Sequence, residues 1–383
     1  MKYNLNVDKL PANYVFGELR QKVAEYERRT GRKAIDLGVG DVKLPLFPCI
    51  IEAMKKAVCE MSEIKSFRGY PPAEGYAFLR EKISENVYGG KISPDEIFIT
   101  DGAKGELGNV TELFERGVKV CFPSPCYPAA AEANIALGNE AEYLVATKEN
   151  DFLSFPPYGK KYDLIYLCSP SNPTGALMDE ELLRSWVNYA LDTKVIIIFD
   201  SAYSAFVPNG KIKSIYEVKD AERCAIEINS FSKSLGFTGV RCGYTVVPKA
   251  LGKIYDIKKR LTGCRFNGVS YVSQRGAESY FSKEGLEAGR KRAEFYKTNA
   301  DIIKIALKNK KMWYNNSCSS PYVFAETPDG LTSKEFCEVL LEKCGIAATA
   351  GSGFGAGGEG YVRFSAFCLR GEALEACDRL LTL

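Results

Sequence analysis

Histidine is absent from this 383-residue sequence. The absence excludes every Ser-His-Asp or Cys-His mechanism, the HExxH zinc site and any histidine general base. Proton transfer must therefore use lysine, tyrosine, aspartate, glutamate or cysteine. The 13 cysteines contain no C-x-x-C pair, so we expect neither a disulfide framework nor a zinc ribbon, and no metal site. A reducing, cytoplasmic location fits this cysteine usage best.

The sequence also lacks an excess of charge of either sign. Lys and Arg number 51 and Asp and Glu 48, which leaves a net charge of +3. Such a balance creates no global field for nucleic acid or a membrane surface. No apolar run reaches the roughly 18 residues of a membrane-spanning helix. The first residues, MKYNLNVDKLPANY, alternate polar and apolar side chains and do not resemble a signal peptide.

Short apolar segments rich in valine and isoleucine alternate with helix-like segments over most of the chain. Examples are IFIT (97–100), DLIYLC (163–168) and KVIIIFD (194–200), and AIDLGVGD (34–41) also reads as a strand. Such runs are typical of parallel strands buried on both faces. Their alternation with helices predicts a doubly wound, mostly parallel α/β domain.

The pattern changes after a predicted helix at about 283–309. Strand-like PYVFAET (321–327) and YVRFSAF (361–367) flank a helix predicted over 333–343, which indicates a smaller α+β domain. At ~150 residues per domain, the length also suggests two domains. We predict three parts, namely an N-terminal segment (1–44) that joins the small domain, a large domain (45–285) and a small C-terminal domain (286–383).

Gly353, Gly355 and Gly358 formally match G-x-G-x-x-G. A dinucleotide-binding loop must follow a strand and open a helix early in a βαβ unit. These glycines instead precede an apparent strand near the end of the chain, which argues against a dinucleotide site. A glycine-rich loop beside a ligand and a plain flexible turn both remain open.

Polar residues follow several predicted strands at the point where each strand ends. Asn172 lies in SPSNPTG (169–175), Asp200 ends KVIIIFD, and SFSK (230–233) with Lys233 follows CAIEINS. In an open α/β sheet, ligands collect at the carboxyl ends of the strands. Taken singly, each residue has an ordinary structural explanation: a turn, a helix cap or salt bridge, or a solvated lysine.

As a set, these residues match the requirements of pyridoxal phosphate (PLP). Lys233 would hold the coenzyme aldehyde covalently, and the Asp200 carboxylate would keep the ring nitrogen protonated. Asn172 and Tyr203 would bond the phenolic oxygen of the ring. The two hydroxyls of SFSK and Arg241 would bind the phosphate.

At this point the sequence resembles the fold-type I aminotransferases, and over nearly its whole length it is similar to the LL-diaminopimelate aminotransferase family. SNPTG and SFSK are shared by many aminotransferases, whereas the FTGVR and GSGFG-x-GGEG strings are much more restrictive. The similar segments are LPANYVF (10–16), IDLGVGD (35–41), FRGY (67–70), TDGAKG (100–105), SPCYPA (124–129), CSPSNPTGA (168–176), DSAY (200–203), SFSKSLGFTGVRCG (230–243), RFNGVS (265–270), PYVF (321–324) and GSGFG-x-GGEGYVRFSAF (351–367).

The resemblance implies a role for each matching residue. The implied catalytic residues are Lys233, Asp200 and Tyr203. The implied coenzyme-binding residues are Ala103, Lys104, Tyr127, Asn172, Asp200, Tyr203, Ser230, Ser232, Lys233 and Arg241, with Tyr70 reaching in from the partner subunit. The implied substrate-binding residues are Gly40, Lys104, Asn172, Asn267 and Arg363, with Tyr14 from the partner subunit. Shared sites imply a homodimer, and the Asn172–Pro173 peptide is expected to be cis.

One loop departs from the family pattern. The tyrosine loop usually reads G-Y-G-x-E-Q-G, and its glutamate contributes to recognition of the far end of diaminopimelate. Here the loop reads GYPPAEG (69–75), so Ala73 stands at that position and Glu74 follows one residue later. Loss of a charge partner in a buried site can change substrate preference, so we expect weaker discrimination for diaminopimelate.

The resemblance implies an aminotransferase that acts on LL-2,6-diaminopimelate, with 2-oxoglutarate as acceptor, in lysine biosynthesis. The alternatives are a transaminase for another donor (lysine, an aromatic or a dicarboxylic amino acid) and a PLP-dependent carbon–sulfur lyase. A PLP-binding regulator would carry an N-terminal DNA-binding domain. Only about 30 residues precede the first segment with catalytic-type residues, which argues against a regulator.

Overall fold

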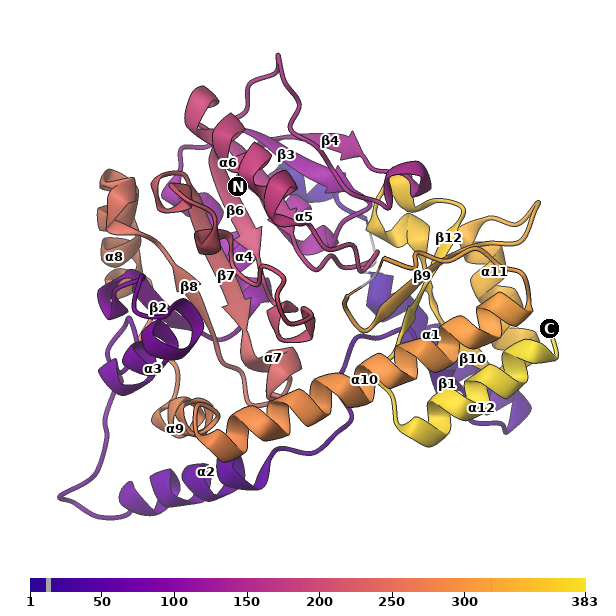
Figure 1. Ribbon diagram of the computed structural model, residues 1–383, viewed down its shortest axis with the longest axis horizontal. Coiled ribbons are helices and arrows are strands. Elements are labelled where there is room, and N and C mark those ends of the chain that lie inside the picture. Colours follow the sequence, from indigo (N-terminus) through magenta and orange to yellow (C-terminus); the bar gives the residue numbers. More distant parts are fainter. Residues whose placement is uncertain (12–14, 318) are drawn as a thin grey trace.

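The computed structural model describes residues 1–11, 15–317 and 319–383. Its largest element is a seven-stranded sheet with the order β2-β8-β7-β6-β5-β3-β4 (Figure 1). The strands are β2 (Ile97–Thr100), β3 (Lys119–Ser124), β4 (Glu140–Val145), β5 (Leu164–Cys168), β6 (Ile196–Asp200), β7 (Ala225–Ser230) and β8 (Gly243–Val246). Only β8 pairs in the antiparallel sense, with both its neighbours, so the predicted mostly parallel sheet is confirmed.

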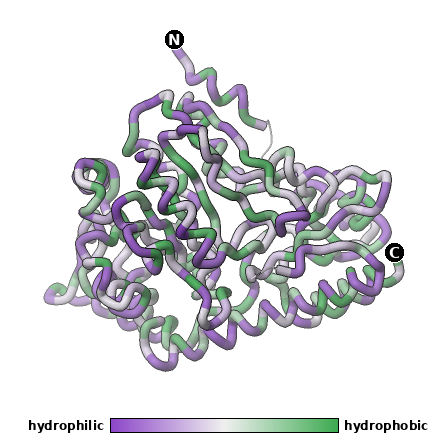
Figure 2. Tube along the Cα trace, turned by 45° about the horizontal axis from the view of Figure 1, so that its top comes forward, coloured by the Kyte–Doolittle hydropathy of each residue, from purple (hydrophilic) through white to green (hydrophobic). Residues whose placement is uncertain are grey.

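Helices cover both faces of this sheet, as a doubly wound domain requires. One core includes residues of α2 (Pro48–Glu60), α3 (Ala77–Tyr88), α6 (Glu180–Thr193) and α9 (Tyr271–Ser279). The core on the opposite face includes residues of α4 (Ala103–Asn109), α5 (Pro128–Leu137) and α8 (Lys253–Arg265). Figure 2 shows apolar stretches along the strands between these layers.

The edge strand β4 is missing from the sequence prediction. Its residues EAEYLV are partly or fully exposed, whereas all residues of β2 and β7 are buried. Only strands buried on both faces give continuous apolar runs, so an edge strand with charged residues carries a weaker signal.

The smaller domain is built on an antiparallel sheet, β11-β12-β9, and a two-stranded parallel pair, β1-β10. Its strands are β1 (Ile35–Asp36), β9 (Tyr322–Glu326), β10 (Ile346–Ala347), β11 (Thr349–Ala350) and β12 (Tyr361–Ser365). Its helices are α1 (Val15–Thr30), α10 (Lys283–Asn309), α11 (Ser333–Val339) and α12 (Arg370–Leu381). The long helix α10 runs from the large domain along the small one (Figure 1). The predicted domain limits stay a prediction.

The strand predicted over 34–41 is wrong beyond its first residues, because β1 ends at Asp36. The Asp36 carboxylate accepts hydrogen bonds from the backbone N–H groups of Gly38 (2.9 Å) and Val39 (3.1 Å). Such local side-chain bonding turns the chain and ends the strand.

Two helices follow strands at the carboxyl edge of the large sheet. α7 (Phe231–Ser234) is a single turn directly after β7, and α4 follows β2.

A buried ion pair holds α4 in place. Glu106 accepts hydrogen bonds from Lys258 Nζ (2.6 Å) and Thr245 Oγ1 (2.8 Å), and both charged side chains are less than a tenth exposed. Burial opposes ionisation of Glu106, but Lys258 and the hydrogen bonds outweigh it and hold its pKa below the ordinary value.

Replacing Lys258 with methionine would leave the Glu106 carboxylate buried without its cation. We expect Lys258→Met to lower the free energy of unfolding by ~3–5 kcal/mol, measured by urea denaturation. The double variant Lys258→Met/Glu106→Leu should regain most of this loss, because it removes the uncompensated charge. A loss below about 1 kcal/mol in the single variant would contradict a buried role for the pair.

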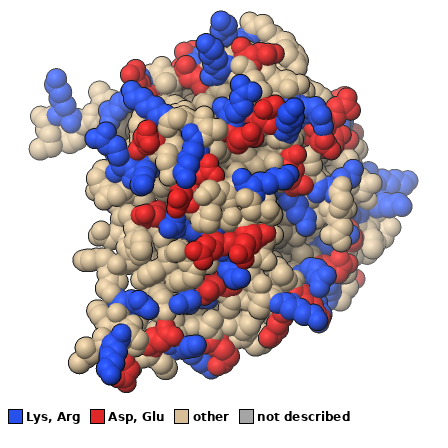
Figure 3. All heavy atoms as spheres, turned by 60° about the vertical axis from the view of Figure 1, so that its left-hand side comes forward, with Lys and Arg blue, Asp and Glu red and all other residues tan. Residues whose placement is uncertain are grey.

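The surface carries both signs of charge. On the face drawn in Figure 3, lysine and arginine are interspersed with aspartate and glutamate. Among the described helices, none combines the length and apolar character needed to cross a membrane. Each cysteine in the described ranges is a free thiol.

Candidate active site

A cavity of about 260 Å³ lies at the carboxyl edge of the large sheet, next to the small domain. β8 runs against its neighbours, so the residues that precede it lie at the edge where β5, β6 and β7 end. Most of the sequence-predicted residues meet at this cavity. They are Gly40, Ala103, Lys104, Tyr127, Asn172, Asp200, Tyr203, Ser230, Ser232, Lys233, Arg241 and Arg363.

One end of the cavity is rich in hydroxyls and positive charge. Ser230 Oγ donates to Ser232 Oγ (3.0 Å), which in turn accepts from Arg241 Nη1 (3.3 Å). Gly102 has a φ of +124°, and a Cβ there would come within 2.5 Å of Arg241 Nη2. Arg241 itself adopts a left-handed φ of +66°, which is unfavourable for a side chain of this size. This constrained arrangement suits a phosphate group.

Asp200 supplies the buried carboxylate. It ends β6 opposite Cys168 of β5, and its Oδ1 accepts a hydrogen bond from the Ala202 backbone N–H (3.0 Å). Burial raises the pKa of Asp200 to about 6, although the Ala202 N–H and the Cys168 thiol favour its ionised form. Within the described ranges no cation pairs with it, so its charge is available to a protonated ring nitrogen.

Asn172 and Tyr203 form a polar wall with a tyrosine from the small domain. Asn172 Nδ2 donates to the Tyr203 hydroxyl (3.3 Å), which lies 3.0 Å from the Tyr322 hydroxyl. Burial raises the pKa of Tyr203 well above its ordinary value, so this phenol stays protonated. The Asn172–Pro173 peptide is cis, as expected.

Tyr322 is a site residue that the sequence analysis did not assign. It lines the cavity and is almost fully buried, although PYVF (321–324) reads as an ordinary core strand. A buried tyrosine hydroxyl needs a polar partner, and this requirement is the one feature of the sequence that could have pointed to a site role for Tyr322.

Lys233 points at the N-terminal segment. Its Nζ donates to the Gly40 carbonyl oxygen, and a Cβ at Gly40 would lie 2.1 Å from the Tyr322 hydroxyl. Burial lowers the pKa of Lys233 to about 8; Asp41 opposes this shift, and Arg363 and Arg241 add to it. A lysine with such a pKa is a competent nucleophile and proton carrier near neutrality.

Arg363 lies at the junction of the domains and is completely buried. Its Nη1 donates to Asn172 Oδ1 (2.7 Å) and its Nη2 to the Gly38 carbonyl oxygen. The Tyr322 ring lies 4.3 Å from the guanidinium carbon. A planar, oriented guanidinium facing the cavity suits a carboxylate.

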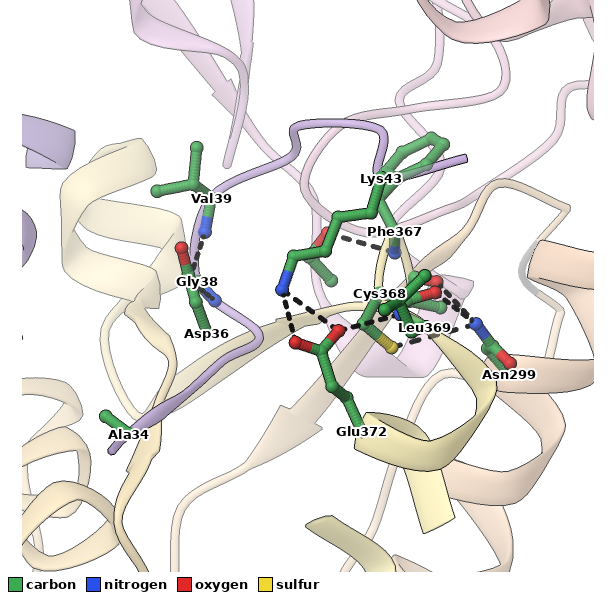
Figure 4. A network of polar contacts seen from close by, with 12 residues as sticks. Ala34, Asp36, Gly38, Val39, Lys43, Asn299, Phe367, Cys368, Leu369 and Glu372 are labelled. Atoms are coloured by element: carbon green, nitrogen blue, oxygen red, sulfur yellow. Dashed lines mark hydrogen bonds and ion pairs between the residues drawn. The ribbon is translucent and has the colours of Figure 1, made fainter. Parts of the chain in front are cut away.

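The segment that carries Gly38 and Gly40 is anchored to the small domain (Figure 4). Lys43 Nζ pairs with Glu372 of α12 (2.8 Å), and Glu372 also accepts from the Leu369 backbone N–H (2.7 Å). Asn299 of α10 donates to the Cys368 carbonyl oxygen (2.8 Å), which fixes the neighbouring chain. These contacts position the backbone carbonyls that Lys233 and Arg363 bind.

Two predicted site residues, Tyr70 and Asn267, are not brought to this cavity. Tyr70 is 87% exposed, and Asn267 is exposed and absent from the lining. Their loops pack together, because a Cβ at Gly268 would lie 2.5 Å from the Pro72 carbonyl oxygen. Tyr14 lies outside the described residues.

The glycine-rich segment 351–358 forms two short turns, η10 (Gly351–Phe354) and η11 (Ala356–Gly358), just before β12. The prediction that these glycines precede a strand is confirmed. The Cys126 N–H donates to the Phe354 carbonyl oxygen (2.9 Å) and the Gly357 N–H to Ser124 Oγ (3.0 Å). A Cβ at Gly357 would lie 2.4 Å from the Ser124 carbonyl oxygen. The glycines thus allow close backbone packing against the end of β3, beside Tyr127.

The sheet, the lysine and the surrounding polar residues define a class of enzyme. The family model for "Aminotransferase class I and II" matches residues 32–380, and the chain belongs to this family. It therefore has the fold-type I architecture and is a PLP-dependent transaminase.

The chain is also similar to particular aminotransferases over its full length. It is 42% identical to LL-diaminopimelate aminotransferase of Prochlorococcus marinus (strain NATL1A), covering 100% of both chains. It is 41% identical to the enzyme of that name from Parabacteroides distasonis, covering 97% of both. The solved L,L-diaminopimelate aminotransferase from Chlamydomonas reinhardtii superposes with a TM-score of 0.94 at 35% identity, covering 99% of this chain and 98% of that one.

The residues around the cavity fit PLP. Asp200 is a buried carboxylate that lacks a cation partner in the described ranges, and Gly102 leaves room beside Arg241 that a side chain would fill. Serine hydroxyls and Arg241 are suitable donors for a phosphate, and Lys233 is the amine in the same cavity.

The lowered pKa of Lys233 predicts how apoprotein captures PLP. Only the neutral amine is nucleophilic, so the capture rate should rise about tenfold per pH unit below pH 8 and level off above it. Absorbance after rapid mixing at pH 6–10 measures this rate, and borohydride reduction with peptide mapping should place the adduct on Lys233. Lys233→Ala is the control and should bind PLP without covalent capture. A rate still rising near pH 10, or an adduct on another lysine, would contradict the assignment.

Proposed function

We propose that this protein transfers an amino group between LL-2,6-diaminopimelate and 2-oxoglutarate, in lysine biosynthesis. The proposal is carried by the full-length similarity to enzymes of that name together with one cavity that combines Lys233, Asp200 and Arg363. We place the protein in the cytoplasm, because its cysteines in the described ranges are free thiols.

Bound PLP would supply an electron sink that stabilises negative charge at the substrate α-carbon. The Asp200 carboxylate would pair with the protonated ring nitrogen, and Asn172 and Tyr203 would bind the ring oxygen. Lys233 Nζ would carry the proton to and from the α-carbon, a role for which a pKa of about 8 is well matched. Tyr127 would cover the ring face.

Ala103, Lys104, Ser230, Ser232 and Arg241 would hold the phosphate.

Arg363 would bind the α-carboxylate of the donor. Asn172 and the Gly38 carbonyl oxygen already hold the guanidinium in one orientation, so little side-chain freedom is lost on binding. Gly40 keeps its place beside Tyr322 free of a side chain, and Lys104 also lines the cavity. The same site can take 2-oxoglutarate, because both substrates present an α-carboxylate.

The proposed donor is tested by a panel of amino acids with 2-oxoglutarate, following glutamate formation. We expect turnover of LL-diaminopimelate, and lower kcat/KM for aromatic and dicarboxylic donors, which lack a distal ammonium. Arg363→Lys should lower kcat/KM for every donor by roughly ten- to a hundredfold, because one ammonium cannot replace the bidentate guanidinium. Wild-type protein that uses another donor and not diaminopimelate would refute the proposed donor but not the transaminase. Release of thiol and pyruvate from cysteine-type donors would indicate the lyase.

We propose that the active unit is a homodimer in which Tyr70, Asn267 and Tyr14 act in the site of the partner subunit. The support is that Tyr70 and Asn267 belong to loops that pack together, exposed and away from the cavity of their own chain. An isologous two-fold interface would exchange such residues reciprocally.

Light scattering should give twice the 42.4 kDa chain mass. Mixed dimers of Lys233→Ala and Tyr70→Ala chains should recover activity that neither variant has alone, because one of their two sites is intact. Absence of recovery in a demonstrated heterodimer would show that Tyr70 serves its own chain.

A further inference from the structure

The coenzyme cavity takes its residues from two loops that follow neighbouring strands. Asp200 and Tyr203 lie at the end of β6 and just after it, whereas Ser230 ends β7 and Lys233 lies on α7. The first loop would bind the ring nitrogen and the ring oxygen of PLP, and the second would hold its aldehyde carbon and its phosphate. One bound ring can therefore meet both loops only if they keep a fixed spacing.

Asn229 of β7 connects these two loops. It is 8% exposed and is not among the described residues that line the coenzyme cavity. Its Nδ2 donates to Ser201 Oγ (2.9 Å) and to Ser204 Oγ (3.1 Å), both in the loop after β6. Its Oδ1 accepts from the backbone N–H of Ser230 (2.7 Å), the residue that caps α7. One side chain thus bonds to both loops.

The loop after β6 is also anchored to the core through Ser201. Because Ser201 Oγ accepts from Asn229, its own proton can go to Glu227 Oε1 (3.0 Å) or to the Ile228 carbonyl oxygen (3.2 Å). The Glu227 carboxylate is fully buried and also accepts from the Tyr88 hydroxyl (2.8 Å). Hydrogen bonds that run in one direction through a buried chain strengthen one another. The Asn229 amide stands at the start of such a chain.

The arrangement requires an amide at position 229. Two serine oxygens each receive a donor, and the Ser230 N–H, which can only donate, needs an acceptor. Only asparagine and glutamine carry two donors and an acceptor on one planar group, and glutamine is one carbon longer. Aspartate would keep the acceptor, lose both donors and bring a second carboxylate near Glu227.

We infer that Asn229 is a positioning residue, which holds Asp200 and Tyr203 at a fixed spacing from α7. It acts through the two serine hydroxyls and the Ser230 N–H, not by contact with PLP or substrate. The inference rests on the roles proposed for Asp200 and Tyr203, and it does not depend on which amino acid is the donor.

The test follows the visible absorbance of bound PLP against pH in wild type, Tyr203→Phe and Asn229→Ala. A donor on the ring oxygen weakens that oxygen's hold on a neighbouring proton, so loss of the donor raises the midpoint of the titration. Tyr203→Phe should raise the midpoint by about 0.5–1 pH unit, and Asn229→Ala should raise it by a smaller amount. The PLP dissociation constant, from equilibrium dialysis, should rise roughly three- to tenfold in Asn229→Ala.

Asn134→Ala is the matched control. Asn134 is a fully buried amide of α5 in the same domain, and it bonds the Ala130 carbonyl oxygen (2.9 Å) and the Asn139 side chain (2.8 Å). Both alanine variants should unfold at lower urea concentration than wild type, because each loses buried hydrogen bonds. Only Asn229→Ala should change the titration midpoint and the PLP dissociation constant.

Ser204→Ala provides a milder second variant, because it removes one bond of a part-buried hydroxyl. It should shift the midpoint in the same direction as Asn229→Ala, by less. Both substitutions break the bond between Asn229 and Ser204, so the double variant should shift no further than Asn229→Ala alone. If Asn229→Ala does not fold, a midpoint in Ser204→Ala equal to that of wild type overturns the inference.

The outcomes separate this inference from the proposed function. A shifted midpoint in Tyr203→Phe with an unchanged one in Asn229→Ala overturns the positioning role and leaves the role of Tyr203 standing. A shift of equal size in Asn134→Ala, or shifts that add in the double variant, also overturns it. A wild-type midpoint in Tyr203→Phe refutes the proposed role of Tyr203 and the inference with it.

Discussion

A fully buried arginine at the meeting point of two domains must have its donors satisfied by groups from both. Two nitrogens of Arg363 are bonded in this way, Nη1 to Asn172 of the large domain and Nη2 to the Gly38 carbonyl oxygen of the N-terminal segment, and the Tyr322 ring lies against its face. Its position depends on all three parts of the chain being assembled. The same groups reach the coenzyme cavity, because Asn172 also bonds Tyr203 and Tyr322 lies against Gly40. The contacts that pack the domains together therefore also set the geometry of the site.

Burial acts in opposite directions on the two titrating groups at the centre of the site. It raises the pKa of Asp200 to about 6 and lowers that of Lys233 to about 8. At neutral pH the carboxylate is still mostly charged, while a useful fraction of the amine is neutral. A chain without histidine thereby obtains a proton carrier that works near neutrality. Desolvation, rather than a special partner, is the main cause in both cases.

The walls of the coenzyme cavity are supported by contacts between residues that have no catalytic role. The glycine turns of 351–358 pack backbone against backbone at the end of β3, and α4 is held from behind by the buried pair of Glu106 and Lys258. These contacts support the parts of the chain that carry Lys104 and Tyr127, which both line the coenzyme cavity.

The sequence by itself determined the strand–helix alternation, the mostly parallel sheet and the set of polar residues at its carboxyl edge. Buried strands such as β6 give continuous apolar runs, and Asp200 and Lys233 follow directly where those runs end, so local pattern was sufficient. The edge strand β4 and the turn at Asp36 were not predicted. β4 carries exposed charged residues, and the turn depends on a hydrogen bond from the backbone to the Asp36 side chain. Only the tertiary structure decided that Tyr322 joins the site and that Asn267 and Tyr70 lie away from it. Those facts depend on how segments more than a hundred residues apart pack together, and neither spacing nor periodicity along the chain encodes that packing.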